Sequence, residues 1–406
     1  MCTSGELAAF RVSCRGKPGL MLNSVDRLSR FARNTLLPLC RDHFFDPVHG
    51  GFHERLGADL IPVATGRKRL MVQARQLYVL SHAALLGDRS GAAAADQGYR
   101  FLLGTYRDHV HGGWHFAATP EGEVLDGSKD LYGHAFLLFA LAWLHRAFSA
   151  RGAIELAAET MDTLHARMAL PYGGFHASAA QEWTPSDGPL LQNPHMHLFE
   201  AVLALHEASG DSRWMEEADA LVRLFRDRLF HRASGTLREV FEVGWITHPQ
   251  RGSIVEPGHQ FEWVWLLDRY RRQGGPIDVT AEIGSLFSFA RSHGFDEEHG
   301  GIHDQVDPDG TPLLRTRRIW PVAETLKAYV AMASTGLATP AEADRMADHL
   351  LRNFVPDDRA GWHETLTREG VPTMTDLPGS TPYHVFLAAI EAEQLTLDRV
   401  GSPTTN

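Results

Sequence analysis

A short glycine-rich motif recurs six times along this chain of 406 residues, and it limits the possible folds more than any other feature. In chain order the copies read HGGFH, HGGWH, YGGFH, SGTLRE, HGGIH and AGWH. The second glycine of each copy, or its only one, stands at position 51, 113, 174, 235, 301 or 361, so the intervals are 62, 61, 61, 66 and 60 residues. Such regular self-similarity predicts one structural unit repeated six times.

Segments with helical periodicity lie on both sides of every copy. Those before the motif cover residues 24–40, 93–106, 153–168, 212–230, 276–292 and 340–353. Those after it cover residues 70–86, 130–148, 194–209, 258–271, 320–334 and 382–394, and they are the more apolar set. The glycines between them fit the tight turns of short β-hairpins.

A single helix pair cannot bury its own apolar face, so the six units must pack against one another. We expect an all-α fold, an (α/α)6 barrel of six helix-hairpin-helix repeats with short β-hairpins, in which the more apolar second helices form the inner ring. An open solenoid is the alternative, but the count of six and the lack of a polar capping repeat favour closure. Residues 1–20 are expected to be a loose N-terminal extension, and residues 21–400 a single catalytic domain.

The composition favours a small-molecule partner. The formal net charge of -11 argues against binding to nucleic acid or to an anionic membrane. No apolar run approaches the roughly 20 residues that span a bilayer, and the first residues do not resemble a secretory signal. The cysteines Cys2, Cys14 and Cys40 lack metal-ligand spacing. We therefore expect a cytoplasmic monomer or homodimer.

In a closed ring, the N-terminal ends of all six inner helices meet at one end of the barrel. The segments there read MVQARQLY, KDLYGHAF, QNPHMHLFEA, EPGHQFEW, RRIWPVAE and STPYH. Their His, Glu, Arg, Tyr and Trp side chains suit a site for a polyol, which needs hydrogen-bonding groups, an aromatic face and groups that titrate near neutral pH. His259 and Glu262 are three residues apart and share a helix face.

Other histidines have simpler interpretations. His53, His115 and His303 belong to the glycine motif and are expected to be part of the hairpin architecture. His195 and His197 are two apart and lie on different helix faces, so at most one enters the site. As an H-x-H pair they could bind a metal with His259 or His384 as a third ligand. No carboxylate cluster or cysteine accompanies them, so we expect no metal.

Taken together, these motifs resemble the N-acylglucosamine 2-epimerase superfamily, which includes cellobiose 2-epimerases and the mannose and sulfoquinovose aldose-ketose isomerases. The resemblance runs from about Met21 to the end and implies an (α/α)6 barrel without a cofactor. It implies that His259 and His384 are the acid/base pair and that Glu262 hydrogen-bonds to His259 and tunes it. The positions that match substrate-contacting residues are Arg75, Tyr132, Asn193, His197 and the stacking Trp320, and Arg251 is the nearest candidate for a further family arginine.

The resemblance also implies chemistry on a monosaccharide, in which a base removes the proton α to the carbonyl and an enediol forms. We expect His384 to take the C2 proton and return it to C1 while His259 shuttles the hydroxyl proton, although the two roles could be reversed. In the 2-epimerases a Trp-Lys pair precedes the final histidine, whereas this chain has Gly379 and Ser380 there. This favours a mannose isomerase that interconverts D-mannose and D-fructose, and also D-lyxose and D-xylulose.

Three alternatives stay open at this point. One is a sugar 2-epimerase of the cellobiose or N-acylglucosamine type. Another is a glycoside hydrolase, which needs two carboxylates and could draw them from Glu200, Glu262 and Glu324. The third is a non-catalytic sugar- or protein-binding member of the superfamily.

Overall fold

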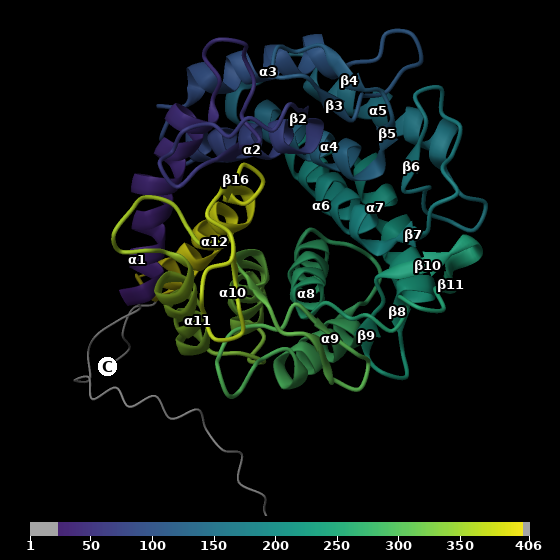
Figure 1. Cartoon of the computed structure of the whole chain (residues 1–406). Helices are drawn as coiled ribbons and strands as arrows, with labels where there is room; N and C mark the ends of the chain where they lie inside the picture. The colour runs from purple at the N-terminus through teal and green to yellow at the C-terminus, as the bar shows by residue number, and fades with distance from the viewer. Residues whose placement is uncertain (1–22, 401–406) are drawn as a thin grey trace, which may run out of the picture.

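The computed structural model describes residues 23–400, with side chains described as far as residue 395, so the extension expected at residues 1–20 lies outside the described part. Within this described part, twelve α-helices form two concentric rings (Figure 1). The inner ring consists of α2 (Leu70–Leu85), α4 (Leu131–Phe148), α6 (Gln192–Ser209), α8 (Pro257–Arg272), α10 (Ile319–Ala333) and α12 (Pro382–Val400). The outer ring consists of α1 (Asn23–Phe31), α3 (Ala92–Tyr106), α5 (Ala153–Met168), α7 (Ser212–Leu224), α9 (Thr280–His293) and α11 (Pro340–Phe354). The predicted (α/α)6 barrel is confirmed.

Burial explains why each helix occupies its ring. Every residue of α2 from Leu70 to Ala84 is buried, as expected for a helix that is apolar nearly all round. In α5 only one stripe is buried, at Ala153, Ala157, Thr160, Met161, Leu164 and Met168, which are spaced by three or four residues. The inner helices thus form the core, and each outer helix covers it with one face. None of the described helices combines the length and apolar character needed to cross a membrane.

Two outer helices continue past their α-helical part in wider, π-helical turns. Such turns follow α1 at η1 (Ala32–Leu36) and η2 (Leu39–Phe44), and follow α7 at η3 (Phe225–Leu229). The predicted segments 24–40 and 212–230 are therefore helical, but not uniformly α-helical. The helix predicted from residue 276 begins at Thr280, whose N–H donates to the side chain of Asp278 at 3.0 Å.

The glycine motif reverses the chain after each outer helix. Gly50 and Gly51 have φ angles of +81° and +70°, a region that side chains disfavour. A Cβ on Gly51 would also lie 2.5 Å from the Phe101 ring. Across the turn, Phe45 and Phe52 form a β-bridge. The same bridge recurs between Arg107 and Trp114, Ala169 and Phe175, and Phe295 and Ile302.

The fourth copy, SGTLRE, corrects the motif alignment by one residue. Leu237 pairs with Phe230 as Phe52 pairs with Phe45, so Thr236 takes the place of the second glycine, not Gly235. The intervals of 61 and 66 residues around this copy therefore become 62 and 65. With this alignment, the residue two positions after the bridge is acidic in four repeats: Glu54, Glu239, Asp304 and Glu364.

Short strands join each repeat to the next and close the ring. The strands are β1 (Arg55–Leu56), β2 (Lys68–Arg69), β3 (Ala117–Ala118), β4 (Val124–Asp126), β5 (Lys129–Asp130), β6 (Ser178–Ala179), β7 (Leu190–Leu191), β8 (Phe230–His231), β9 (Thr236–Leu237), β10 (Val240–Glu242), β11 (Ile246–Thr247), β12 (Gln305–Val306), β13 (Pro312–Leu314), β14 (Arg317–Arg318), β15 (Thr365–Leu366) and β16 (Leu377–Pro378), with a 3₁₀ turn η4 (Val243–Trp245). Antiparallel pairs β2–β3, β5–β6, β7–β10 and β14–β15 and the bridge Val255–Val306 link successive repeats. Finally β16 pairs with β1, which joins the last repeat to the first. This circular pairing excludes the open solenoid.

Candidate active site

The two predicted acid/base histidines both pack against one indole. His259 is the third residue of α8 and His384 the third residue of α12, and both are buried. The ring of Trp320, at the start of α10, lies 5.0 Å from the His259 ring and 5.7 Å from the His384 ring between centroids. Gly258 permits this packing, because a Cβ there would lie 2.7 Å from the indole. Barrel closure thus brings together residues that are 125 positions apart in the sequence.

His259 is held by a glutamate that the sequence did not identify. Its Nδ1 lies 2.9 Å from Oε2 of Glu239, on the chain between β9 and β10. The expected hydrogen bond from Glu262 is wrong, because both carboxylate oxygens of Glu262 lack a hydrogen-bond partner among the described residues. Burial lowers the pKa of His259, but the charges of Glu239, Glu256 and Glu262 outweigh it and raise the pKa to about 9. His259 is therefore cationic at neutral pH.

His384 has the opposite charge state. Its Nδ1 lies 2.7 Å from Oε1 of Glu324, and the other oxygen of that carboxylate lies 2.6 Å from Nζ of Lys327. Burial, together with the positive charges of Arg75 and Lys327, lowers the pKa of His384 well below its ordinary value of 6.5. Burial also raises the pKa of Glu324. His384 is therefore neutral at neutral pH and can accept a proton.

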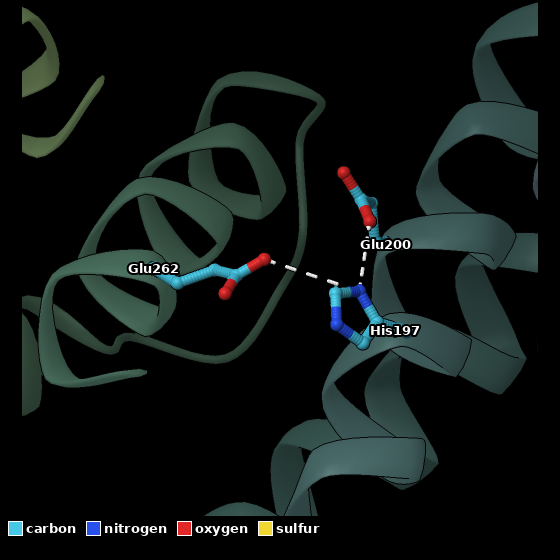
Figure 2. Close-up of side chains that lie close together, drawn as sticks. All are labelled: His197, Glu200 and Glu262. Atoms are coloured by element: carbon cyan, nitrogen blue, oxygen red, sulfur yellow. Dashed lines mark hydrogen bonds and ion pairs between the residues drawn. The ribbon is translucent and has the colours of Figure 1, made fainter. Parts of the chain in front are cut away.

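A second cluster lies beside this pair, where α6 faces α8 (Figure 2). His197 Nδ1 lies 3.2 Å from Oε2 of Glu200 and 3.9 Å from Oε1 of Glu262. The Tyr383 hydroxyl donates to the same oxygen of Glu200 at 2.5 Å. Burial lowers the pKa of His197 to about 4, and burial together with the charge of Glu324 raises the pKa of Glu262 well above its ordinary value. His197 is thus neutral, and Glu262 favours its protonated form.

This cluster overturns one premise of the sequence argument about metals. Carboxylates from α6, α8 and α10 do accompany the histidines, and His197, Glu200 and Glu262 could together hold a divalent cation. The H-x-H pair does not act as a unit, however. His195 turns away from the site, and its Nε2 accepts a hydrogen bond from the Phe175 N–H at 2.9 Å. As expected, only one histidine of the pair reaches the site.

Arg75 and Tyr132 form a further part of the site, next to His197. Arg75 donates through Nη2 to the Tyr132 hydroxyl at 2.7 Å and through Nη1 to the Ser380 carbonyl at 3.2 Å. Its guanidinium also lies over the Phe136 ring, 4.1 Å from the centroid. The Tyr132 ring lies 5.1 Å from that of His197. Packing therefore holds the arginine rigidly, while its Nε has no hydrogen-bond partner in the part of the chain that the structure describes.

The remaining predicted contacts are less closely joined to the site. Asn193, at the start of α6, is half-buried, and its Oδ1 has no hydrogen-bond partner among residues 23–395. Arg251 lies in the turn before α8 and is exposed, and no hydrogen bond or ion pair joins its side chain to the described site residues. Lys129 and Arg317 clamp the glycine turns instead, through Asp108 and the Gly300 carbonyl, respectively.

The sequence model of the N-acylglucosamine 2-epimerase (GlcNAc 2-epimerase) family matches residues 50–388, most of the chain. The chain belongs to this family. Its relatives include a mannose-6-phosphate isomerase of Rhizobium meliloti (strain 1021), which is 35% identical over 381 residues, 90% of this chain and 96% of the relative. A D-mannose isomerase of Thermobifida fusca is 30% identical over 78% of this chain and 82% of its own.

A solved structure agrees with this assignment. The cellobiose 2-epimerase of Spirochaeta thermophila DSM 6192 superposes with a TM-score of 0.83 at 26% identity and covers 93% of this chain and 97% of its own. The resemblance inferred from the motifs is confirmed. As a member of the N-acylglucosamine 2-epimerase family whose relatives are isomerases and epimerases, the protein is an enzyme of that class.

Sequence reasoning missed the residues of this family member that set the charges of the two histidines. Glu239 stands in the degenerate motif copy, and only the corrected alignment shows that it matches Glu54 and Asp304. Lys327 lies one helical turn after Glu324, and that spacing was a usable signal for an ion pair.

Proposed function

We propose that the protein interconverts D-mannose and D-fructose through a cis-enediol. The observation that carries this proposal is the opposite charge state of two histidines that both pack against Trp320. A neutral His384 is suited to remove the proton at C2, and a cationic His259 is suited to give a proton to the carbonyl oxygen. Since Nδ1 of each ring is bound to a glutamate, Nε2 of each is left for the sugar.

The steps balance without another reactant. His384 takes the C2 proton of open-chain mannose, and the electron pair moves to O1 as the enediolate forms. His259 gives its Nε2 proton to O1 and then takes the proton from O2, which becomes the ketone oxygen. His384 returns its proton to C1 and yields fructose. Both histidines end in the state in which they began.

The other site residues bind the sugar in this proposal. Arg75 and the Tyr132 hydroxyl offer hydrogen-bond donors near the developing enediolate, where preorganised donors are most effective. His197, Asn193 and Glu262 contact hydroxyl groups, and the Trp320 indole stacks on the C–H face of the sugar. Arg251 contributes weakly, because its side chain is exposed.

Two features favour a free monosaccharide. Gly379 is tightly enclosed, because a Cβ there would lie 2.8 Å from the His53 carbonyl oxygen, which leaves no room for a tryptophan. Two arginines at this end of the barrel are already paired with acids, Arg69 with Glu54 at 2.8 Å and Arg318 with Asp304 at 2.7 Å. A phosphate would have to compete with these carboxylates.

A 2-epimerase is the second candidate, because the family includes such enzymes. Epimerisation through two bases requires one neutral histidine to take the C2 proton and one protonated histidine to return a proton to the other face. The charge states of His384 and His259 meet this requirement too, so the identity of the product separates the two candidates.

The test is a comparison of substrates by proton NMR, using chelator-treated enzyme with mannose, lyxose, cellobiose and mannose 6-phosphate. We expect fructose and xylulose to form, with kcat/KM at least about tenfold higher for mannose than for mannose 6-phosphate. Activity is expected to survive the chelator. Predominant conversion of mannose 6-phosphate, or of cellobiose to its epimer, would overturn the proposal.

A further inference from the structure

We propose that Glu239 is the positioning residue that fixes the tautomer and the positive charge of His259. Its effect on turnover rests on the proposed isomerase function, but its effect on His259 does not. In this proposal Glu239 does not contact the sugar and acts through the imidazole. Its Oε2 binds His259 and Gln192.

A chain of donors fixes the direction of each hydrogen bond. The indole N–H of Trp263 can only donate, and it donates to Oε1 of Gln192 at 2.9 Å. The amide of Gln192 must therefore present its NH₂ group on the other side, where it donates to Oε2 of Glu239 at 2.8 Å. The same oxygen lies 2.9 Å from Nδ1 of His259, and the Gln192 nitrogen lies 3.0 Å from that Nδ1. With the carboxylate ionised, both nitrogens donate to this one oxygen, so Nδ1 of His259 carries hydrogen and a proton that enters or leaves does so at Nε2.

The other repeats show what is special about Glu239. At the equivalent positions, Glu54 binds Arg69 at 2.8 Å and Asp304 binds Arg318 at 2.7 Å, and each arginine is the last residue before an inner helix. In the fourth repeat that position is Glu256 instead of an arginine. An acid that elsewhere anchors the start of a helix here has His259 as its positively charged partner.

No lysine or arginine in the described part of the chain contacts the His259 ring directly. Glu256 Oε2 lies 3.7 Å from Nδ1, and Arg318 binds the same oxygen at 3.4 Å. Glu262, on the same helix, also raises the pKa of His259 when its carboxyl is ionised, although burial favours the protonated form of that carboxyl. On the neighbouring helices, Glu324 and the neutral His197 also interact with His259. Glu239 is the only one of these acids within hydrogen-bond distance.

Burial makes this contact costly to lose. Glu239 is 7% exposed and His259 is 7% exposed, so neither charge is well solvated by water. Without the carboxylate, the buried imidazole would lose its proton more readily, and either nitrogen could carry the remaining hydrogen. An enzyme that needs a donor at Nε2 would then keep its sugar contacts but lose its acid.

The experiment compares Glu239→Gln with Glu54→Gln, which removes the matching charge in the first repeat. The titration of His259 is followed by NMR of ¹⁵N-histidine-labelled, sugar-free enzyme, with its signal assigned from a His259→Asn variant. In Glu239→Gln we expect the pKa of His259 to fall by about 1 to 3 pH units, because an adjacent negative charge is removed. In Glu54→Gln we expect it to stay in place.

Steady-state kinetics on mannose give a second test of the role of Glu239. With Glu239→Gln, kcat on mannose should fall by about 10²-fold while KM changes little, and the alkaline limb of the kcat profile should move to lower pH. If the glutamine variant fails to fold, Glu239→Asp keeps the charge and should keep His259 cationic above pH 7. An unchanged His259 titration in Glu239→Gln, or an equal shift in Glu54→Gln, would overturn the inference.

The two proposals can fail separately. A wild-type enzyme that does not convert mannose, but whose His259 loses its proton in Glu239→Gln, would overturn the proposed function and support the role of Glu239. If the wild type converts mannose but the His259 titration is the same in Glu239→Gln and Glu54→Gln, the proposed function is supported and the role of Glu239 is overturned.

Discussion

His259 and His384 begin from the same local design and reach opposite charge states. Each is the third residue of an inner helix, each is buried, and each has Nδ1 against a glutamate, at 2.9 and 2.7 Å. Yet the pKa of His259 is raised to about 9 and that of His384 is lowered well below 6.5. The hydrogen bond to a carboxylate therefore does not by itself decide the charge of a buried imidazole.

The difference lies in what else the carboxylate binds. Glu324 has Lys327 2.6 Å away, and Arg75 adds a second positive charge near His384. Glu239 forms no ion pair with a lysine or arginine within the described part of the chain, and Glu256 lies nearby. His259 is therefore the cation that balances nearby carboxylates, whereas His384 lies beside a carboxylate, Glu324, whose charge is already balanced by Lys327.

Removing the base should have the largest effect. His384→Asn should lower kcat by about 10²–10⁴-fold, because the variant lacks the imidazole that takes the C2 proton. The control is His195→Gln, since Gln73 and Gln260 already accept the matching backbone hydrogen bond in their own repeats. Turnover of mannose by both variants is the measurement. Equal losses in the two would mean that His384 is structural.

Removing the positive charge of Lys327 beside Glu324 should raise the pKa of His384 toward that of His259. In Lys327→Met the charge of Glu324 would act on His384 alone, so the pKa of His384 should rise. Because the base works when neutral, a higher pKa moves the acid limb of kcat to higher pH, and activity at pH 6 should fall more than activity at pH 8. The pH profile of the variant checks this. An acid limb at the wild-type position would contradict the comparison.

Gly379 supports the His384 side through backbone contacts. Its carbonyl accepts from Gln76 at 2.7 Å, and an added Cβ would lie 2.8 Å from the His53 carbonyl oxygen. Gly379→Ala should therefore lower the free energy of unfolding by about 1–3 kcal/mol. Urea unfolding measures this, with Gly284→Ala as the control, because a Cβ at Gly284 meets nothing within 4 Å. Equal stability of the two variants would show that the close packing at Gly379 relaxes freely.

The smallest effect is expected at Arg251, on the turn that leads to the His259 helix. Since its side chain is exposed, Arg251→Ala should change kcat/KM for mannose by less than about threefold. A loss greater than tenfold would restore the sequence-based assignment of Arg251 as a substrate contact.

The sequence predicted the parts of the molecule that follow from periodicity. The 60-residue repeat and the apolar second helices were enough to predict the barrel, and the helix starts located His259 and His384. The partner of His259 could not be predicted, because Glu239 lies in the degenerate motif copy and was displaced by one residue in the alignment. The three-residue spacing of His259 and Glu262 correctly gave one helix, but it could not show that Glu262 faces His197.

The charge environment was also beyond linear reasoning. Glu200, Glu262 and Glu324 come from three helices and meet only when the ring closes, so their cluster is invisible as a motif. The pKa values depend on this assembly, since burial and charges from several helices act on each histidine.

The most direct test of the account follows the hydrogen at C2. D-Mannose labelled with deuterium at C2 is incubated with the enzyme in ordinary water, and the products are read by proton and deuterium NMR. With His384 as the single base, fructose should form with deuterium at one of the two C1 positions, diluted only as far as His384 exchanges with water. Glucose carrying solvent hydrogen at C2, without labelled fructose, would contradict the account.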